Sequence, residues 1–254
     1  MPKTRFVWTV EGGTASLELA LVLGRQRHPF DFGAPPATRP MFVNDFLIGS
    51  TTVTESLWAS IMRDQGQPEV RPSSNLPVVD VSWDEIVRPG GFLDRLNNSS
   101  SRGQVEAALG HPSGHFRLPT EVEWEYAARG GRDWSDGYQF SGSDDIDSVA
   151  WYDRKHGDHR QPVALKQPNQ LGLFDMSGNV WEWCQDVYTP DVSLIPTDGT
   201  AYTGPGDERV LRGGCFHNGK IHCTVSKRYE IGSQYHDECI GMRLAYDLNA
   251  SRRA

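Results

Sequence analysis

The chain has 254 residues, of which 37% are hydrophobic, 23% charged and 10% aromatic. This composition is typical of a folded globular protein and excludes a chain that is disordered along most of its length. Its 26 glycines, 16 prolines and 8 tryptophans favour a loop-rich fold with an aromatic core over a helical bundle.

Charge and hydropathy exclude two classes of partner. The formal net charge is −8, and no cluster of lysines and arginines offers the basic patch that nucleic-acid phosphates require. The most apolar stretch, residues 15–23, contains Glu18 and is far shorter than the roughly 20 residues of a membrane span. The first residues also lack the continuous apolar core of a secretory signal. We therefore expect no nucleic acid and no membrane as partners, and a cytoplasmic location.

The first third of the chain predicts an N-terminal extension and two strand-to-helix units. Residues 1–40 have no assignable role and are expected to pack on the domain, with a short helix over the apolar run 17–23. Residues 41–49 predict a strand, and 52–62 a helix that Thr54 caps. A second short strand and helix follow over 76–85, with Ser82 as the N-cap. Residues 97–115 predict a polar loop.

The helix with the clearest sequence signals covers 120–129. Thr120 is its N-cap, Glu123 completes a capping box, and two glycines at 130–131 end it. From there to the C-terminus only short strands are predicted, at 149–152, 172–174, 180–183, 209–212 and 240–245. Because no linker or repeat divides the chain, we expect one α+β domain over 41–246 with a large coil content, followed by a tail at 247–254.

Four sequence blocks follow one another in order: RLPTEVEWEYAARGG (117–131), NQLGLFDMSGNVWEW (169–183), RVLRGG (209–214) and IGMRLA (240–245). Together with weaker matches at 41–62 and 76–96, they resemble the formylglycine-generating enzyme family, also called the sulfatase-modifying-factor domain. The resemblance covers about residues 40–246. It implies a C-type-lectin-like α+β fold with little regular structure. The family includes copper oxidases, iron-dependent sulfoxide synthases, siderophore-maturation proteins, catalytically silent paralogues and hypervariable ligand-binding proteins.

The copper oxidases of that family share a Gly-Gly-Ser-Tyr/Phe-x-Cys-x4-Cys pattern, whose two thiolates bind copper(I). Here Cys223 falls on the second cysteine position, but Asn218 stands at the first. An amide is a poor copper(I) ligand, so the standard formylglycine-generating activity is not expected. Cys215 is a substitute thiolate only if the loop is rebuilt. The favoured interpretation makes Cys215 and Cys223 small buried apolar residues.

Two further observations concern metals and thiols. The four cysteines are too few for a disulfide scaffold and form no CxxC pair, so we expect reduced thiols. The His-x3-His-x-Glu pattern by which the sulfoxide synthases bind iron is absent from the sequence. A site for copper, iron or zinc is an alternative in the 25-residue segment that holds three histidines and three cysteines, but hydrogen-bonded surface histidines are favoured. That segment contains Cys215, His217, His222, Cys223, His236 and Cys239.

A calcium site is expected at the turn before the Trp-Glu-Trp block. The resemblance implies four ligands: the side chains of Asp175 and Glu182 and the carbonyl oxygens of Gly178 and Val180. Two carboxylates and two carbonyls are the oxygen donors that calcium prefers. The alternative is that both carboxylates only accept hydrogen bonds from a tight turn. Trp181 and Trp183 are expected in the core rather than on a ligand-stacking surface.

The segment 215–239 mixes aromatic and charged side chains, as recognition surfaces do. Its candidate ligand-binding residues are Phe216, His217, His222, Tyr229, Tyr235 and His236. We therefore expect a calcium-stabilised recognition module that binds a protein or a small molecule through this segment, with an ordinary solvated loop as the alternative. The alternative function is a metal-dependent (iron or copper) oxidoreductase acting on a cysteine peptide or a small molecule, with Cys223, Cys215 and His217 as candidate catalytic residues.

Overall fold

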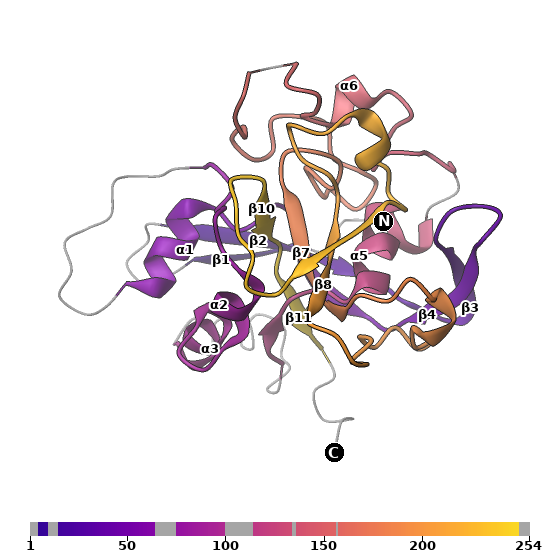
Figure 1. Ribbon diagram of the computed structural model, residues 1–254, viewed down its shortest axis with the longest axis horizontal. Coiled ribbons are helices and arrows are strands. Elements are labelled where there is room, and N and C mark those ends of the chain that lie inside the picture. The colour runs from indigo at the N-terminus through magenta and orange to yellow at the C-terminus, as the bar shows by residue number, and fades with distance from the viewer. Residues whose placement is uncertain are drawn as a thin grey trace.

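Two β-sheets and a β-hairpin, joined by short helices and long irregular segments, make up the molecule (Figure 1). The computed structural model describes residues 5–9, 15–63, 75–99, 114–133, 136–155 and 157–248. Most of the predicted loop at 97–115 and nearly all of the predicted tail lie outside these residues. Among the described residues, no helix has the length and apolar character needed to cross a bilayer.

The first sheet has five antiparallel strands in the order β1-β2-β5-β11-β6. Strand β2 pairs with β5, with Leu19 opposite Gly49, so residues before 41 contribute strands to the sheet. The C-terminal strand β11 lies between β5 and β6. The strands are β1 (Arg5–Thr9), β2 (Ser16–Val22), β5 (Phe46–Gly49), β6 (Phe116–Arg117) and β11 (Ala245–Asp247).

The helix predicted over 17–23 is wrong, because these residues form strand β2. Leu17 and Leu19 lie in one apolar cluster, while Ala20 and Val22 lie in another. The sheet is therefore covered by core on both of its faces. A strand buried on both faces reads as a continuous apolar run, which periodicity alone does not distinguish from a buried helix.

The second sheet has the order β10-β7-β8-β9, with β10 parallel to β7 and the other pairs antiparallel. Its strands are β7 (Trp181–Val187), β8 (Glu208–Arg212), β9 (Arg228–Gly232) and β10 (Ile240–Met242). The predicted strands at 180–183 and 209–212 are confirmed. The strand predicted at 240–245 is instead divided between β10 and β11, which belong to different sheets.

The predicted helix starts are confirmed by the capping bonds. The side chain of Thr54 accepts a hydrogen bond from the N–H of Leu57, and the Ser82 and Thr120 capping boxes are both formed. The α-helices are α1 (Glu55–Met62), α2 (Trp83–Val87), α3 (Phe92–Asn98), α5 (Glu121–Ala128) and α6 (Ile146–Val149). Helix α3 includes the first residues of the predicted 97–115 loop. Helix α6 ends where a strand at 149–152 was predicted, and no strand forms at 172–174.

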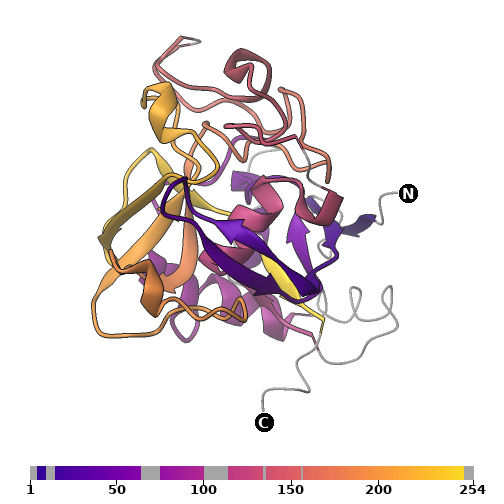
Figure 2. The ribbon, with the colours of Figure 1, turned by 90° about the vertical axis from the view of Figure 1, so that its right-hand side faces the viewer.

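Helix α5 is enclosed on all sides. Figure 2 shows the hairpin of β3 (Arg25–Phe32) and β4 (Arg39–Val43) crossing in front of it, and α5 also contacts β7 and β8. The strand predicted over 41–49 is thus two strands, β4 and β5, in different sheets. All eight residues of α5 are buried, including Glu121, Glu123 and Glu125. Because a buried carboxylate is costly unless it is paired, the helix requires cationic partners.

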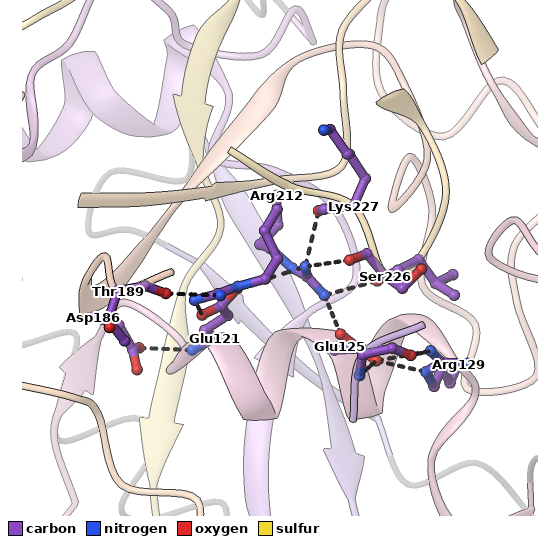
Figure 3. Close-up of polar contacts among 11 residues, drawn as sticks. Glu121, Glu125, Arg129, Asp186, Thr189, Arg212, Ser226 and Lys227 are labelled. Atoms are coloured by element: carbon purple, nitrogen blue, oxygen red, sulfur yellow. Dashed lines mark hydrogen bonds and ion pairs between the residues drawn. The ribbon is translucent and has the colours of Figure 1, made fainter. Parts of the chain in front are cut away.

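Arginines from three other segments supply these partners, as Figure 3 shows for two of the three glutamates. Arg228 forms two hydrogen bonds with Glu121, of 2.6 and 2.8 Å, and Arg117 forms two with Glu123, of 2.6 and 2.7 Å. Arg212 pairs with Glu125. Arg212 also donates to the backbone carbonyls of Val225 (2.8 Å), Ser226 (3.1 Å) and Lys227 (2.9 Å), so it ties the α5 helix to the segment that leads into β9.

Replacing Arg212 with methionine is expected to lower the free energy of unfolding by about 3–5 kcal/mol. Glu125 keeps Arg129 as its other ion-pair partner, but it loses Arg212, and three backbone carbonyls lose their guanidinium donor. Urea unfolding measures the change. Arg154→Met is the matched control, because Arg154 pairs with Asp158 at the surface with 59% of its side chain exposed, where ion pairs contribute about 0–1 kcal/mol. Equal losses in the two variants would contradict the role given to Arg212.

Asp186 generates a pH-dependent prediction. Burial, with a smaller contribution from the charge of Glu121, raises the pKa of Asp186 from 3.8 to about 7. The folded protein therefore keeps a proton that the unfolded chain loses, so the stability from this group is present below about pH 4 and is lost as the pH rises towards 7. The variant Asp186→Asn does not lose stability in this way, because an asparagine side chain does not titrate.

The difference in unfolding free energy between Asp186→Asn and the wild type should therefore shift in favour of the variant from pH 4 to pH 8. Urea unfolding at several pH values measures it, and Asp31→Asn at an exposed position of β3 is the matched control. A difference that stays constant with pH would show that Asp186 does not hold a proton in the folded state.

Candidate functional site

The segment that follows β8 begins with two glycines whose backbone conformation and close contacts no other residue would accept. Gly213 and Gly214 have φ values of +98° and +76°, in the left-handed region that glycine adopts without steric cost. A Cβ on Gly214 would lie 2.8 Å from the carbonyl oxygen of His222 and 2.9 Å from the Sγ of Cys223. The glycine pair thus lets residues 222–223 pack directly on the end of β8.

The two residues that align with the copper ligands of the family do not form a copper site. Cys223 is fully buried in a small apolar cluster with Ile146, Val149 and Tyr152. Burial raises the pKa of the Cys223 thiol to about 12. The Asn218 side chain uses its Oδ1 to accept the Cys215 N–H at 3.2 Å. A protonated buried thiol and a neutral amide do not fit copper(I), which binds thiolates.

Cys215 is paired with a different thiol from the one that the sequence pattern indicates. Its Sγ lies 2.9 Å from the Sγ of Cys239, which precedes β10. The Nδ1 of His217 lies 3.4 Å from the Cys239 Sγ. All four cysteines are free thiols, as predicted. The buried position predicted for Cys215 and Cys223 is confirmed.

The three histidines of the segment 215–239 have separate partners. His217 Nε2 lies 2.8 Å from Asp158, and His236 Nδ1 lies 2.7 Å from Asp80. The hydrogen bond that the His236 ring donates to Asp80, together with the negative charge of Asp80, raises the pKa of His236. The His222 ring lies edge-on to Trp181, with the ring centroids 6.4 Å apart. Within the described residues no group of three or more His, Cys, Asp or Glu side chains could hold a metal ion.

The segment 215–239 carries three large exposed side chains, one of them on β9. Tyr229 is 42% exposed, Tyr235 46% and Ile221 67%. The Tyr229 ring stacks on Trp181 at 5.4 Å between centroids, with 26° between the ring planes. We call Ile221, His222, Tyr229 and Tyr235 the aromatic face. Trp181 and Trp183 are buried, as predicted.

Phe216 is the one candidate ligand-binding residue that the structure places in the core. It is only 3% exposed and packs in the largest apolar cluster, so the expectation that it lies on the recognition surface is wrong. Backbone hydrogen bonds explain this position. The N–H of Phe216 donates to the carbonyl of Asn179, and the carbonyl of Phe216 accepts from the N–H of Arg154. These two bonds hold residue 216 in the interior. Arg228, also in this segment, points inward to Glu121.

The turn predicted to bind calcium precedes β7 and contains a buried carboxylate oxygen without a hydrogen bond among the described residues. Asp175, Gly178 and Asn179 have positive φ values of 57°, 78° and 64°. The Asp175 Oδ2 accepts the Ala164 N–H at 2.9 Å, while its buried Oδ1 has no hydrogen bond among the described residues. Burial raises the pKa of Asp175 to about 6. This orphaned oxygen fits a cation site.

The Glu182 carboxylate, unlike the Asp175 Oδ1, already has protein partners. Its carboxylate pairs with Arg243 at 2.8 Å and accepts the indole N–H of Trp124 at 2.7 Å. Each carboxylate oxygen has two lone pairs, so Glu182 can share an oxygen with a cation while Arg243 stays in contact. The chemistry of Asp175 and Glu182 therefore fits a hard divalent cation.

The fold and the motifs define a C-type-lectin-like α+β domain of the type found in formylglycine-generating enzymes. The chain belongs to the family described as the Sulfatase-modifying factor enzyme 1-like domain, whose model matches residues 3–248. The match begins well before residue 41, consistent with the strands that the N-terminal residues contribute to the first sheet.

Three known proteins illustrate the relationship. The Chaperone protein LppX of Paenibacillus barcinonensis is 30% identical over 219 residues, which cover 66% of this chain and 77% of that protein. The Formylglycine-generating enzyme of Streptomyces coelicolor is 31% identical over 175 residues, which cover 63% of this chain but 47% of the enzyme. The structure of Treponema denticola variable protein 1 superposes with a TM-score of 0.71 at 25% identity, covering 95% of this chain and 98% of that one.

Proposed function

We propose that this protein is a recognition module of its family, which binds a protein partner through the aromatic face and is stabilised by calcium at the Asp175 turn. The observation that carries the proposal is the exposure of Ile221, Tyr229 and Tyr235 on one segment, where the buried Trp181 supports the Tyr229 ring. Exposed tyrosines supply large contact areas at low entropic cost, and they dominate many protein interfaces.

The support beneath the face favours binding over a passive loop. Trp181 is only 6% exposed, and β9, which carries Tyr229, pairs with β8 over five residues. A side chain that is held before binding loses less freedom on binding, so its contacts contribute more to affinity. Acidic Glu238 and basic Lys220 are exposed beside the face, which suits a partner with polar groups around an apolar centre.

The copper chemistry that the sequence resemblance implies for the oxidases of the family is not proposed for this chain. Asn218 occupies the first copper-ligand position with its oxygen bonded to the Cys215 N–H, and Cys223 is a buried, protonated thiol. The iron or copper oxidoreductase considered from the sequence therefore has no donor set among these residues.

Tyr229→Ala and Tyr235→Ala are expected to weaken partner binding by about 2 kcal/mol or more each, while the melting temperature changes little. The measurement is panning of a displayed random-peptide library on the wild type, followed by titration of the selected peptides against each variant. Leu194→Ala is the matched control, because Leu194 is 53% exposed and lies in the separate 3-10 turn η2 (Val192–Leu194).

Selected peptides that bind the two tyrosine variants as tightly as the wild type would exclude the aromatic face as the recognition surface. Unfolding of both variants would instead assign the two rings to the scaffold.

Calcium would be held by the side chains of Asp175 and Glu182 and by the carbonyls of Gly178 and Val180. When bound, it supplies a double positive charge that stabilises two buried carboxylates on one turn. The turn precedes β7, the strand that carries Trp181. Glu182 also contacts Trp124 of α5. Calcium at this turn would therefore stiffen the support beneath the aromatic face.

Calcium is expected to raise the stability of the wild type by about 2.7 kcal/mol at a hundredfold excess over its dissociation constant. Differential scanning calorimetry with calcium and with a chelator measures the shift in melting temperature. Asp175→Ala should abolish the shift because it removes the side-chain oxygens, whereas Asp31→Ala on the exposed side of β3 should retain it. The site would be refuted if the melting temperature of the wild type were the same with calcium and with the chelator.

A further inference from the structure

We propose that Cys215 and Cys239 are an oxidisable thiol pair, which a peroxide converts to a disulfide that closes the segment carrying the aromatic face into a covalent loop. The two sulfurs lie 2.9 Å apart and belong to residues 24 positions apart in the chain. This proposal concerns the thiols alone and does not depend on whether the aromatic face binds a partner.

The backbone fixes both cysteines where they meet. The Cys215 N–H bonds to the side chain of Asn218 at 3.2 Å, directly after the glycine pair that ends β8. The Cys239 carbonyl accepts the Trp181 N–H at 2.7 Å, and its own N–H donates to Asp237 at 2.8 Å. A disulfide needs an S–S distance of about 2.05 Å. Because the sulfurs are already in contact, side-chain rotations that bring them less than about 1 Å closer would form the bond.

The two thiols have different chemical roles. The hydrogen bond from Cys239, with further bonds from the backbone N–H groups of His217 and Asn218, lowers the pKa of Cys215, although its burial opposes this. The thiolate is the reactive form of cysteine, so Cys215 is the attacking sulfur. The pKa of Cys239 is raised, first by its hydrogen bond to Cys215 and then by burial. Cys239 therefore stays a thiol and acts second.

His217 is placed to take the proton of Cys239. Its Nε2 lies 2.8 Å from Asp158, and its Nδ1 lies 3.4 Å from the Cys239 Sγ. If Nε2 carries the ring proton and donates it to Asp158, Nδ1 is an acceptor to which the Cys239 S–H can turn once Cys215 is oxidised and no longer accepts that proton. A carboxylate, an imidazole and a thiol in sequence make Cys239 a better nucleophile than burial alone would allow.

The oxidation proceeds in two balanced steps, with hydrogen peroxide as the oxidant. The Cys215 thiolate attacks one peroxide oxygen, the O–O bond breaks, hydroxide leaves and a sulfenic acid forms. The Cys239 sulfur then attacks the Cys215 sulfur and its proton passes to His217. The S–O bond breaks, and the departing hydroxide takes that proton from His217 and leaves as water. The hydroxide of the first step takes up the proton that Cys215 lost as it became a thiolate. In total, two thiols and one peroxide give one disulfide and two waters, and two electrons pass from sulfur to oxygen. A small dithiol reverses the reaction by thiol–disulfide exchange.

Cys223 provides the internal control. It packs against Gly214 on the side of the small cluster around Ile146 and Val149, whereas Cys215 and Cys239 belong to the largest apolar cluster. With its pKa at about 12, the Cys223 thiol stays protonated and unreactive near neutral pH.

The experiment treats the fully reduced, intact chain with hydrogen peroxide, alkylates it under denaturing conditions, and maps its peptides without reduction. We expect one cross-linked peptide pair joining Cys215 and Cys239 with the loss of two hydrogens, and alkylated Cys184 and Cys223. The oxidised protein should melt at a higher temperature, because the closed loop restricts the unfolded chain. The variant Cys223→Ala should give the same cross-link.

Three variants separate the roles. Cys239→Ser should stop at a Cys215 sulfenic acid that a carbon nucleophile traps, and Cys215→Ser should leave Cys239 fully alkylated. His217→Gln should form the same cross-link more slowly and accumulate the trapped sulfenic acid. The proposal is overturned if Cys215 and Cys239 of the wild type remain alkylated after excess peroxide, or if the cross-link joins Cys223 instead. Because the wild-type map alone decides between these outcomes, a variant that fails to fold does not obscure the answer.

Discussion

The interaction on which the rest of the structure depends is the burial of two arginines, Arg212 and Arg243, whose side chains have no exposed surface. The longest α-helices in the described residues have eight residues, so many backbone carbonyls lie in irregular segments that must satisfy them by other means. A guanidinium group has five donors in a fixed plane. Arg212 bonds three carbonyls before β9, and Arg243 bonds those of Gly49 and Phe174.

Each buried arginine also forms hydrogen bonds with the backbone next to one of the proposed functional sites. Arg212 links Glu125 of α5 to residues 225–227, which lead directly into β9 and Tyr229. Arg243 links Glu182 to the carbonyl of Phe174, which precedes the proposed calcium turn. Both arginines therefore connect the core of the fold to the surfaces that we propose to act. Removing either charge would leave a buried carboxylate without this partner, which is why the cost falls on the whole domain.

Local sequence signals predicted the local structure well. Thr54, Ser82 and Thr120 cap helices as predicted, because a capping bond needs only residues within one helical turn. The predictions failed where packing from distant parts of the chain decides. The sequence predicts a helix for strand β2, because a strand covered on both faces by distant segments has a continuous apolar run. It predicts an exposed Phe216, because no neighbouring residue shows that Asn179 and Arg154 bond its backbone in the interior. It groups Cys239 with candidate metal ligands, because the contact with Cys215 depends on strands β8 and β10 both lying beside β7.

Arg212 fixes the segment that leads into the aromatic face, and hydrogen exchange of the variant Arg212→Lys tests this claim most directly. Lysine keeps the charge but has no planar set of donors to hold the three carbonyls. Compared with the wild type, we predict faster amide exchange in residues 225–232, with exchange in β2, β5 and β11 unchanged. Unaltered exchange in residues 225–232, or an equal increase throughout the chain, would contradict the claim that this arginine positions the face.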